Sequence, residues 1–389
     1  MKQIAIIKLG ALGDVLRTTA LLRPLLLTYP RSRITWITSK EALPLLQGNP
    51  SIHEALPYAP SLSRRLRSTR FDLLLSMDDD PTSGELATSL RAGRLVGSYR
   101  DRSERMVYTP SSAKWFRMGL LNRDPDGGLQ HANALKRRNR KTYVQIWAEI
   151  LGLERSGDSQ RYEPLLVLSE HEVKEAEYFA RFHELGPNDG VVGFNPGAGS
   201  RWPSKRMSPE YAATIARRIR DRISTPVLLL GGPEERATHR RILQLADGAA
   251  IDAGTSHSLR SFAALVKLCG VVVTSDSLTL HIGTALKKPI IAFFGPTAPQ
   301  EIDLYGRGVK LLPPEPCRCF YERTCRLARS CVNRLEINQL LQALEQILGT
   351  HQVAHGNGWI NDDRQTAAGV DSRIDQAASR SAALLETHS

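Results

Sequence analysis

Charged and hydroxyl side chains gather in one short segment of the chain's second half. Asp276, Ser277 and His281 follow the apolar run 271–273 and precede a second apolar run, 289–294. This order predicts a strand, a polar turn, a helix and another strand. In open α/β sheets, ligands bind where the carboxyl ends of parallel strands face the amino ends of the following helices. These three side chains are therefore candidates for ligand binding.

Two more polar motifs follow apolar runs in the same half. Ser200 ends a glycine-containing turn after 191–194, Lys205 lies a few residues later, and Glu234 and Glu235 follow Gly-Gly-Pro after the next run. Glycines let a phosphate approach backbone N–H groups, and a lysine places a point charge against a pyrophosphate. A carboxylate one strand away can bind ribose hydroxyls. Any one of these glycines could serve only a tight turn, but motifs at several neighbouring strand ends favour a ligand site.

The first half of the chain places one carboxylate in a similar position. Asp14 lies in a glycine-containing turn after the first apolar run. If it faces the second half of the chain, it can act as a general base. Asp is also a favoured helix N-cap, and the turn alone favours a cap for a helix that starts at Val15.

Basic residues form two clusters in the first half, one around Arg64 and one that includes Arg137 and Arg138. The net charge of +12 favours an anionic partner. A solvated basic helix face is the alternative for each cluster. Nucleic acid is not expected, because no aromatic residues alternate with the basic ones as stacking platforms.

Apolar runs alternate with helical patterns twice along the chain, which predicts an α/β fold. The predicted strands are 3–8, 34–38, 71–76, 95–97, 191–195, 227–230, 271–274 and 290–294. Near-continuous Val, Ile and Leu are typical of parallel strands that are buried on both faces. Ser208 and Pro209 predict the start of one helix, and apolar spacing predicts a closing helix over 337–347.

The doubled pattern predicts two Rossmann-like domains that face each other across a cleft. We place the first domain at residues 1–184, the second at 185–349, and a polar tail, which we expect to be mobile, at 350–389. The segment 98–141 lacks clear periodicity and predicts a long loop, which is either functional or disordered.

Length and composition suit a protein with two full cores and no membrane anchor. The chain has 389 residues, of which 41% are hydrophobic and 24% are charged. No apolar run approaches the length of a membrane span, and the amino terminus enters a strand without a cleavage signal. A cytoplasmic protein is expected.

Taken together, the motifs resemble glycosyltransferase family nine, the heptosyltransferases that build the inner core of lipopolysaccharide. The segments that carry the resemblance occur in the family's order and are 8–15, 195–198, 205–206, 231–234, 275–281 and 295–297. The resemblance covers residues 1 to about 349. It implies a GT-B fold, a nucleotide-activated sugar as donor, with ADP-heptose as the family default, and an inverting transfer. The implied acceptor is an anionic glycolipid, an acidic lipopolysaccharide core, reached by peripheral contact with the cytoplasmic face of the inner membrane.

The resemblance also implies roles for individual residues. By matching positions, Asp14 is the catalytic base, Lys205 contacts the donor phosphates, and Glu234 or Glu235 contacts the ribose. Ser200, Asp276, Ser277 and His281 belong to the donor side, and we assign Arg64, Arg137 and Arg138 to the acceptor. No cofactor is expected, because Lys205 and helix N-termini can stabilise the leaving diphosphate in place of a divalent metal.

One residue departs from the family pattern and keeps alternatives open. Leu278 stands where the family usually has glycine, which removes cheap access to positive φ and close approach to the donor. A non-catalytic nucleotide-sugar-binding or assembly protein of the same fold therefore remains an alternative, as does a GT-B nucleotide-sugar epimerase. The acids at 78–80 are a candidate metal site, although a turn and helix cap are the commoner role of such a run.

Four cysteines lie within fifteen residues, at Cys317, Cys319, Cys325 and Cys331. The spacing C-x-C-x5-C-x5-C differs from the usual C-x2-C of zinc sites. Metal binding, reduced packing thiols and disulfides all stay open. We expect these residues to be structural and remote from the chemistry, just before a closing helix that crosses back to the first domain.

Overall fold

A computed structural model describes residues 1–120, 128–153, 162–186 and 189–354. The first part of the chain forms one six-stranded sheet in the order β3-β2-β1-β4-β5-β6. Its strands are β1 Gln3–Ile7, β2 Arg33–Thr38, β3 Glu54–Pro57, β4 Arg70–Ser76, β5 Arg91–Arg100 and β6 Met106–Tyr108. Neighbouring strands are parallel except β5 and β6.

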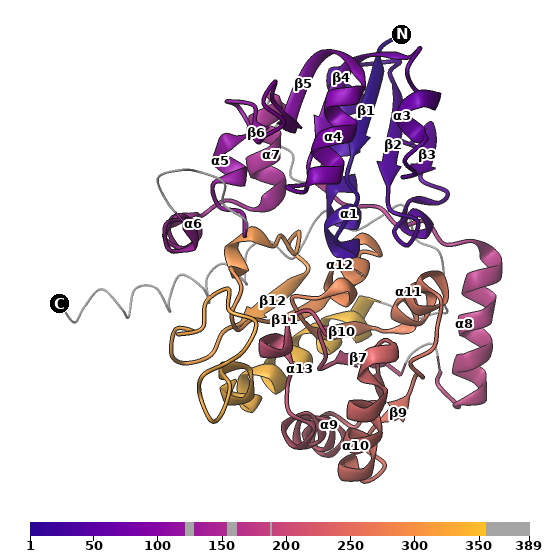
Figure 1. Cartoon of the computed structure of the whole chain (residues 1–389). Coiled ribbons are helices and arrows are strands. Elements are labelled where there is room, and N and C mark those ends of the chain that lie inside the picture. Colours follow the sequence, from indigo (N-terminus) through magenta and orange to yellow (C-terminus); the bar gives the residue numbers. More distant parts are fainter. Residues whose placement is uncertain (121–127, 154–161, 187–188, 355–389) are drawn as a thin grey trace.

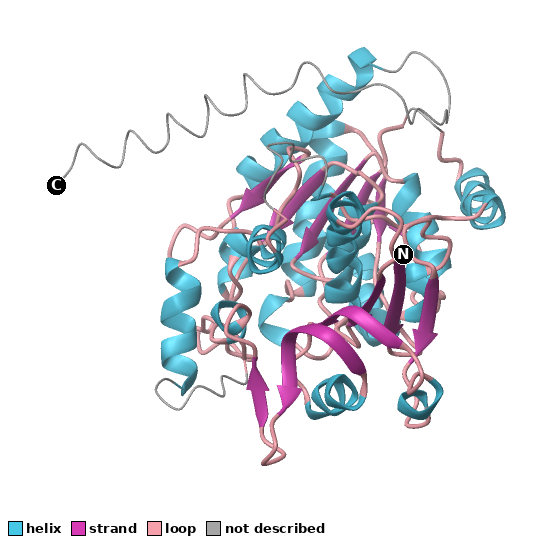
Figure 2. Ribbon diagram, turned by 90° about the horizontal axis from the view of Figure 1, so that it is seen from above, coloured by secondary structure: helices cyan, strands magenta, loops and turns pink. Residues whose placement is uncertain are grey.

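A second six-stranded sheet, in the order β12-β11-β10-β7-β8-β9, is parallel throughout. Its strands are β7 Val192–Asn195, β8 Val227–Leu229, β9 Ile251–Asp252, β10 Val271–Ser275, β11 Ile290–Phe293 and β12 Gly308–Leu311. The two sheets lie one above the other in Figure 1, and Figure 2 shows helices packed around both groups of strands. The predicted α/β organisation in two parallel-sheet units is therefore confirmed.

Helices connect the strands and cover the sheets. Those of the first part are α1 Leu12–Thr18, α2 Leu22–Thr28, α3 Leu62–Arg65, α4 Pro81–Ser89, α5 Ala113–Phe116, α6 Gly128–Arg138, α7 Tyr143–Leu151 and α8 Glu170–Phe182. Those of the second part are α9 Pro209–Ile223, α10 Arg236–Ala246, α11 Leu259–Leu268, α12 Leu278–Ala285 and α13 Ile337–Ala354. In the described part of the chain, none of them is long and apolar enough to cross a membrane.

Local sequence explains where the better-defined helices begin. The Ser208 side chain accepts a hydrogen bond from the N–H of Tyr211 and Pro209 occupies the first helical position, as predicted for α9. Thr142 and Ser169 each start a capping box, with α7 and α8 respectively. The central strands β1 and β10 are buried almost throughout, and most of their residues are accordingly Val, Ile or Ala.

The eight predicted strands are present, but two stretches differ from the prediction. Strands β3, β6, β9 and β12 were not predicted, because these short edge strands lack a continuous apolar run. The segment 98–141 is not one long loop, since it contains the end of β5 together with β6, α5 and α6. Its residues 121–127 lie outside the described part, as does most of the predicted tail, 355–389.

The helix that joins the two sheets is α8 and not the closing helix. Helix α13 packs on α9 and on β10 to β12, so the prediction that it crosses back to the first domain is wrong. Helix α8 packs against α11 through Ala176 and Ala180, and Figure 1 shows it beside α11. Arg260 of α11 reinforces this contact with an ion pair of 2.6 Å to Glu172. The domain boundary at 184 and 185 stays a prediction.

Candidate active site

Helices α1 and α12 meet where the two sheets face each other, and they carry Asp14 and His281 respectively (Figure 1). At this junction, the backbone of Gly13 on α1 lies directly against the imidazole ring of His281 on α12. A Cβ atom on Gly13 would lie 2.3 Å from Cδ2 of the imidazole, a distance that real contacts do not reach. A glycine at position 13 is therefore needed for His281 to lie against the turn that carries Asp14.

Asp14 is the third residue of α1, so the prediction that it caps a helix starting at Val15 is wrong. The helix begins at Leu12, and its N-cap, Ala11, makes no side-chain cap bond. The Asp14 carboxylate pairs instead with Arg17 at 2.9 Å, and about a third of its side chain is exposed. Burial raises the pKa of Asp14, but the positive charges of Arg17 and Lys8 outweigh that effect and hold it below its ordinary value. The carboxylate is thus ionised and open to a substrate proton.

Arg17 is a residue of the site that the sequence did not indicate. Its guanidinium lies 4.0 Å from the ring centroid of Tyr143 and 5.9 Å from that of Trp115, in cation–π geometry. The Tyr143 hydroxyl is 2.6 Å from Oγ1 of Thr18. These aromatic contacts fix the arginine that orients Asp14. An arginine three residues after Asp14 on the same helix was the available signal.

A buried ion pair lies beneath the same turn. Lys8 donates to Asp78 and, at 2.6 Å, to the carbonyl of Gly10, while Asp78 also accepts from the N–H of Leu9. This pair ties β1 to the loop after β4 and fixes the backbone that leads to Asp14.

The acids at 78–80 serve three separate partners. Asp80 caps α4, so the predicted helix cap is confirmed for this residue, and Asp79 accepts from the Tyr108 hydroxyl at 2.9 Å. No group of three acidic, Cys or His side chains in the described ranges could hold a metal ion.

The second domain brings Lys205, Asp276 and His281 together, as the sequence predicted. Nζ of Lys205 is 2.7 Å from Oδ2 of Asp276, and Nε2 of His281 is 3.9 Å from Oδ1. Burial, reinforced by the charge of Arg17, lowers the pKa of His281 to about 4. Burial opposes ionisation of Asp276, but Lys205 and His281 hold its pKa well below the usual range. At neutral pH the cluster contains one ammonium, one carboxylate and a neutral imidazole.

The loop before α12 adopts helical geometry at the unusual residue. Leu278 is the first residue of α12, and Ser277 is its N-cap, with Oγ at 3.0 Å from Oγ1 of Thr274. Leu278 is not among the residues with positive φ. The backbone at Leu278 therefore does not use the positive φ that would favour glycine.

The two glutamates predicted for the ribose differ in their surroundings. Glu235 is buried, and its two oxygens accept from the N–H groups of Gly199 at 2.7 Å and Gly232 at 2.9 Å. It therefore joins the loops after β7 and β8. Glu234 is exposed and accepts from the Ser200 hydroxyl at 2.7 Å. The ribose contact stays a prediction, and of the two Glu234 has the more accessible carboxylate.

The basic residues predicted for the acceptor lie apart. Arg64 is on α3, beside β3 at one edge of the first sheet, whereas Arg137 and Arg138 are on α6, beyond the opposite edge (Figure 1). Arg137 lies over the ring of Phe320, 4.1 Å from its centroid. Helix α6 thus faces the second domain, and one small acceptor cannot contact Arg64 and α6 together.

Lys136, a further member of the second basic cluster, makes the closest of these contacts. Lys136 of α6 is buried, and its Nζ lies 3.9 Å from the centroid of the Tyr321 ring. Burial lowers its pKa to about 8. The N–H of Tyr321 donates to the carbonyl of Pro296 at 2.6 Å. The segment between β12 and α13 therefore reaches both α6 and the loop after β11.

The four cysteines lie in that segment and form two pairs. Sγ of Cys319 is 3.8 Å from Sγ of Cys325. A hydrogen bond from the Cys331 thiol lowers the pKa of Cys317 to about 7. All four thiols are free. Tyr321 of this segment contacts Pro296 in the loop after β11. The expectation that the four cysteines are remote from the chemistry stays a prediction.

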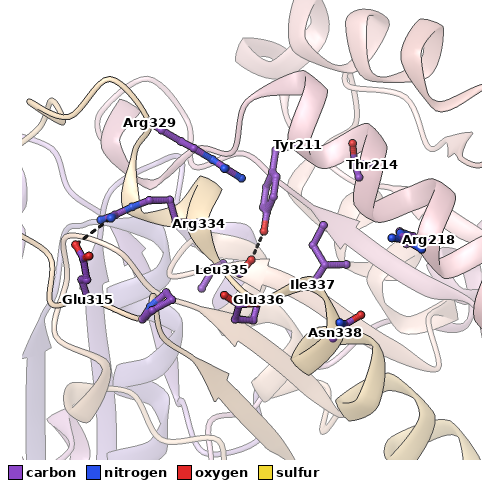
Figure 3. A pocket seen from close by; sticks show the side chains of 11 residues that line it. Tyr211, Thr214, Arg218, Glu315, Arg329, Arg334, Leu335, Glu336, Ile337 and Asn338 are labelled. Atoms are coloured by element: carbon purple, nitrogen blue, oxygen red, sulfur yellow. Dashed lines mark hydrogen bonds and ion pairs between the residues drawn. The ribbon is translucent and has the colours of Figure 1, made fainter.

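Two cavities differ in size and position. The smaller, of about 10 Å3, lies between the domains and is lined by Arg17, Tyr143, His281, Thr284 and Glu301, among others. The larger, of about 500 Å3, lies on the second domain between α9 and the start of α13. Figure 3 shows its side chains, including Tyr211, Arg218, Arg329 and Arg334. None of the predicted site residues lines the larger cavity.

One tryptophan lies near Arg17 in the first domain, and another lies near Lys205 in the second. Trp115 is the indole near Arg17, and Nζ of Lys205 lies 5.6 Å from the ring centroid of Trp202. Trp202 in turn meets Tyr321 edge to face, with 6.2 Å between ring centroids.

Comparisons with known proteins show which sequences this chain resembles. The family model for glycosyltransferase family 9 (heptosyltransferase) matches residues 125–329. Lipooligosaccharide heptosyltransferase 2 of Haemophilus influenzae is 24% identical over 319 residues, which cover 76% of this chain and 84% of the relative.

Solved structures share the fold at low sequence identity. A glycosyl transferase of family 9 from Veillonella parvula aligns with a TM-score of 0.71 and 21% identity, over 90% of this chain and 98% of that one. ADP-heptose lps heptosyltransferase II of E. coli aligns with a TM-score of 0.63 and 19% identity, over 90% of this chain and all (100%) of that one. These likenesses confirm the predicted GT-B type of fold.

Proposed function

Because the chain belongs to glycosyltransferase family 9, the heptosyltransferases, we propose that this glycosyltransferase moves a heptose from ADP-heptose to an acidic lipopolysaccharide core acceptor, with inversion at the anomeric carbon. The observation that carries the proposal is the position of Asp14. This ionised and partly exposed carboxylate of the first domain lies opposite the Lys205, Asp276 and His281 cluster of the second. The names of the relatives and of the E. coli structure support the sugar, the donor and the acceptor class.

In the proposed reaction, Asp14 takes the proton of the acceptor hydroxyl as that oxygen attacks the anomeric carbon. The nucleoside diphosphate leaves from the opposite face of the sugar, which gives inversion. Lys205 and the amino end of α12 offset the charge that develops on the leaving group. Lys205 has Asp276 as its partner at 2.7 Å, so the diphosphate shares this ammonium with the carboxylate.

Neutral His281 completes the donor side. With a pKa of about 4 it carries no charge at neutral pH, so its imidazole can donate one hydrogen bond and accept another. Glu234, next to Ser200, is the proposed ribose contact. The exposed basic residues of α3 and α6 would face an anionic glycolipid at the cytoplasmic surface of the inner membrane.

A transfer assay tests the proposal directly. The protein is incubated with ADP-heptose and a truncated lipopolysaccharide acceptor, and ADP release and the acceptor mass are followed together. Both ADP release and a gain of one heptose are expected. ADP-heptose that is bound but never cleaved would instead favour a non-catalytic sugar-nucleotide-binding protein, and a changed sugar configuration without transfer would favour an epimerase.

Chelation tests whether the leaving diphosphate is stabilised without a divalent metal ion. Activity is expected to survive EDTA, because fixed positive charge and a helix N-terminus serve the diphosphate. Loss of activity with EDTA, followed by recovery with magnesium or manganese, would contradict this part of the mechanism.

A further inference from the structure

Two buried polar atoms without a hydrogen-bond partner lie at the junction of the two domains. One is Nε of Arg17 on α1, and the other is Oε1 of Glu301, which ends the short 3-10 helix Pro299–Glu301 after β11. Both residues line the small interdomain cavity. Most buried polar groups in proteins have a partner, because an unpaired group costs stability. A donor and an acceptor that are both unpaired beside one cavity therefore indicate a ligand.

The charges around Glu301 indicate what kind of ligand fits. Its side chain is buried, and the charged groups that act on it are Arg17 and Lys136, which are positive, and Asp14 and Asp276, which are negative. With Glu301 itself, three acidic groups face two basic ones, so a further anion is disfavoured there. A hydroxyl group both donates and accepts a hydrogen bond, and it can satisfy Oε1 and Nε at the same time.

We propose that Glu301 and Arg17 bind a neutral hydroxyl group of the acceptor sugar, next to the hydroxyl that reacts, and that Glu301 thereby determines which acceptors are used. The hydroxyl donates to Oε1 of Glu301 and accepts from Nε of Arg17. A cavity of about 10 Å3 has room for about one oxygen atom, so the hydroxyl group enters it and the rest of the sugar stays outside. Because Arg17 is held by Asp14 at 2.9 Å, the bound hydroxyl lies on the acceptor side of the site. This inference rests on the proposed function, since it takes the acceptor to be a sugar.

If Glu301 binds a substrate hydroxyl, its replacement should affect the melting temperature differently from the replacement of a residue that only supports the fold. Removal of a supporting residue lowers the melting temperature. Removal of a buried carboxylate oxygen that has no protein partner leaves the melting temperature unchanged or raises it, because the cost of burying that group disappears. Binding of the acceptor should weaken in the same variant.

The variants Glu301→Ala and Glu301→Gln test this, with Gln300→Ala on the same 3-10 helix as the control. Binding of a truncated lipopolysaccharide acceptor is measured by calorimetry with ADP present, and ADP binding is measured separately. Glu301→Ala should weaken acceptor binding about tenfold or more, the loss expected for a hydrogen bond to a charged group. Glu301→Gln should lose less, because its amide oxygen still accepts. Unchanged acceptor affinity, altered ADP affinity or a lower melting temperature in Glu301→Ala would overturn the proposal.

Acceptors that lack one hydroxyl locate the contact and separate this proposal from the proposed function. The deoxy acceptor that binds the wild type more weakly should lose no further affinity with Glu301→Ala, since the same bond is removed twice. Further loss for every deoxy acceptor would overturn the assignment. A wild type that binds the acceptor but transfers nothing from ADP-heptose would refute the proposed function, while the binding comparison would still decide the role of Glu301. A wild type that does not bind the acceptor would overturn both.

Discussion

The two cavities described above differ in which domains line them and in how their polar groups are paired. The larger one belongs to the second domain alone, and several of its polar groups already bond within the protein: Tyr211 donates to the carbonyl of Leu335, and Arg334 pairs with Glu315 at 3.0 Å (Figure 3). The smaller one is built by both domains and has an unpaired atom from each, Nε of Arg17 and Oε1 of Glu301, whereas the unpaired atom at the larger one, Nε of Arg334, comes from the second domain alone. Volume therefore does not identify the site of a two-substrate reaction. Unpaired polar groups supplied from two domains are the feature on which we base the proposed site.

The strongest test of this comparison is Asp14→Asn. The variant should fold and bind ADP normally but turn over about a hundredfold more slowly or worse, the usual scale for a lost general base. Single-turnover transfer and ADP calorimetry measure the two effects. Normal turnover, or failure to fold, would show that Asp14 is not the base.

Lys205→Ala should have the next largest effect. ADP affinity should fall about tenfold or more, and transfer should slow with it, because the ammonium meets the diphosphate in the ground state and in the transition state. Arg206→Ala offers a neighbouring loss of positive charge as a control, since its guanidinium donates to the carbonyl of Gly199. Equal ADP affinity in the wild type and Lys205→Ala would remove Lys205 from the donor site.

The depressed pKa of His281 predicts a pH dependence of stability. Between pH 6.5 and about 4 the unfolded chain binds a proton at this imidazole that the folded protein does not. The free energy of unfolding should therefore fall as pH falls through this window, by up to about 3 kcal/mol. Urea unfolding at several pH values measures the slope. His281→Gln should flatten it, and the exposed His53→Gln should not. An equal slope in both variants would contradict the assignment.

The smallest effect is expected at the larger cavity. Arg218→Ala removes an exposed guanidinium from α9 and should change the free energy of unfolding by no more than about 0.5 kcal/mol, as surface substitutions usually do. Transfer and ADP binding should match the wild type. A marked loss of transfer activity would show that the larger cavity does take part in the reaction.

The sequence was most informative where one local rule decides the outcome. Apolar runs predicted the eight main strands, and Ser208 with Pro209 predicted the start of α9, because strand burial and helix capping depend on neighbouring residues. Glycine and polar residues at strand ends likewise predicted that Lys205, Asp276 and His281 would meet.

The sequence could not reveal contacts between distant segments. Glu301 comes near Arg17 and Lys136 only because α1, α6 and the loop after β11 meet in space, and no spacing pattern records the position of Glu301. The same limit explains the error over the closing helix. An apolar stripe shows that α13 packs on something, but it does not say on which domain.

The positions of two tryptophans give this protein a built-in optical signal. Trp115 lies near Arg17 on the first domain, and Trp202 lies near Lys205 on the second. Indole emission responds to nearby charge, so a substrate that changes the partners of Lys205 should change the fluorescence of Trp202. With Trp115 replaced by Phe, donor binding could be timed by stopped flow without a dye or a label. The converse replacement, Trp202→Phe, would leave Trp115 to report on the acceptor.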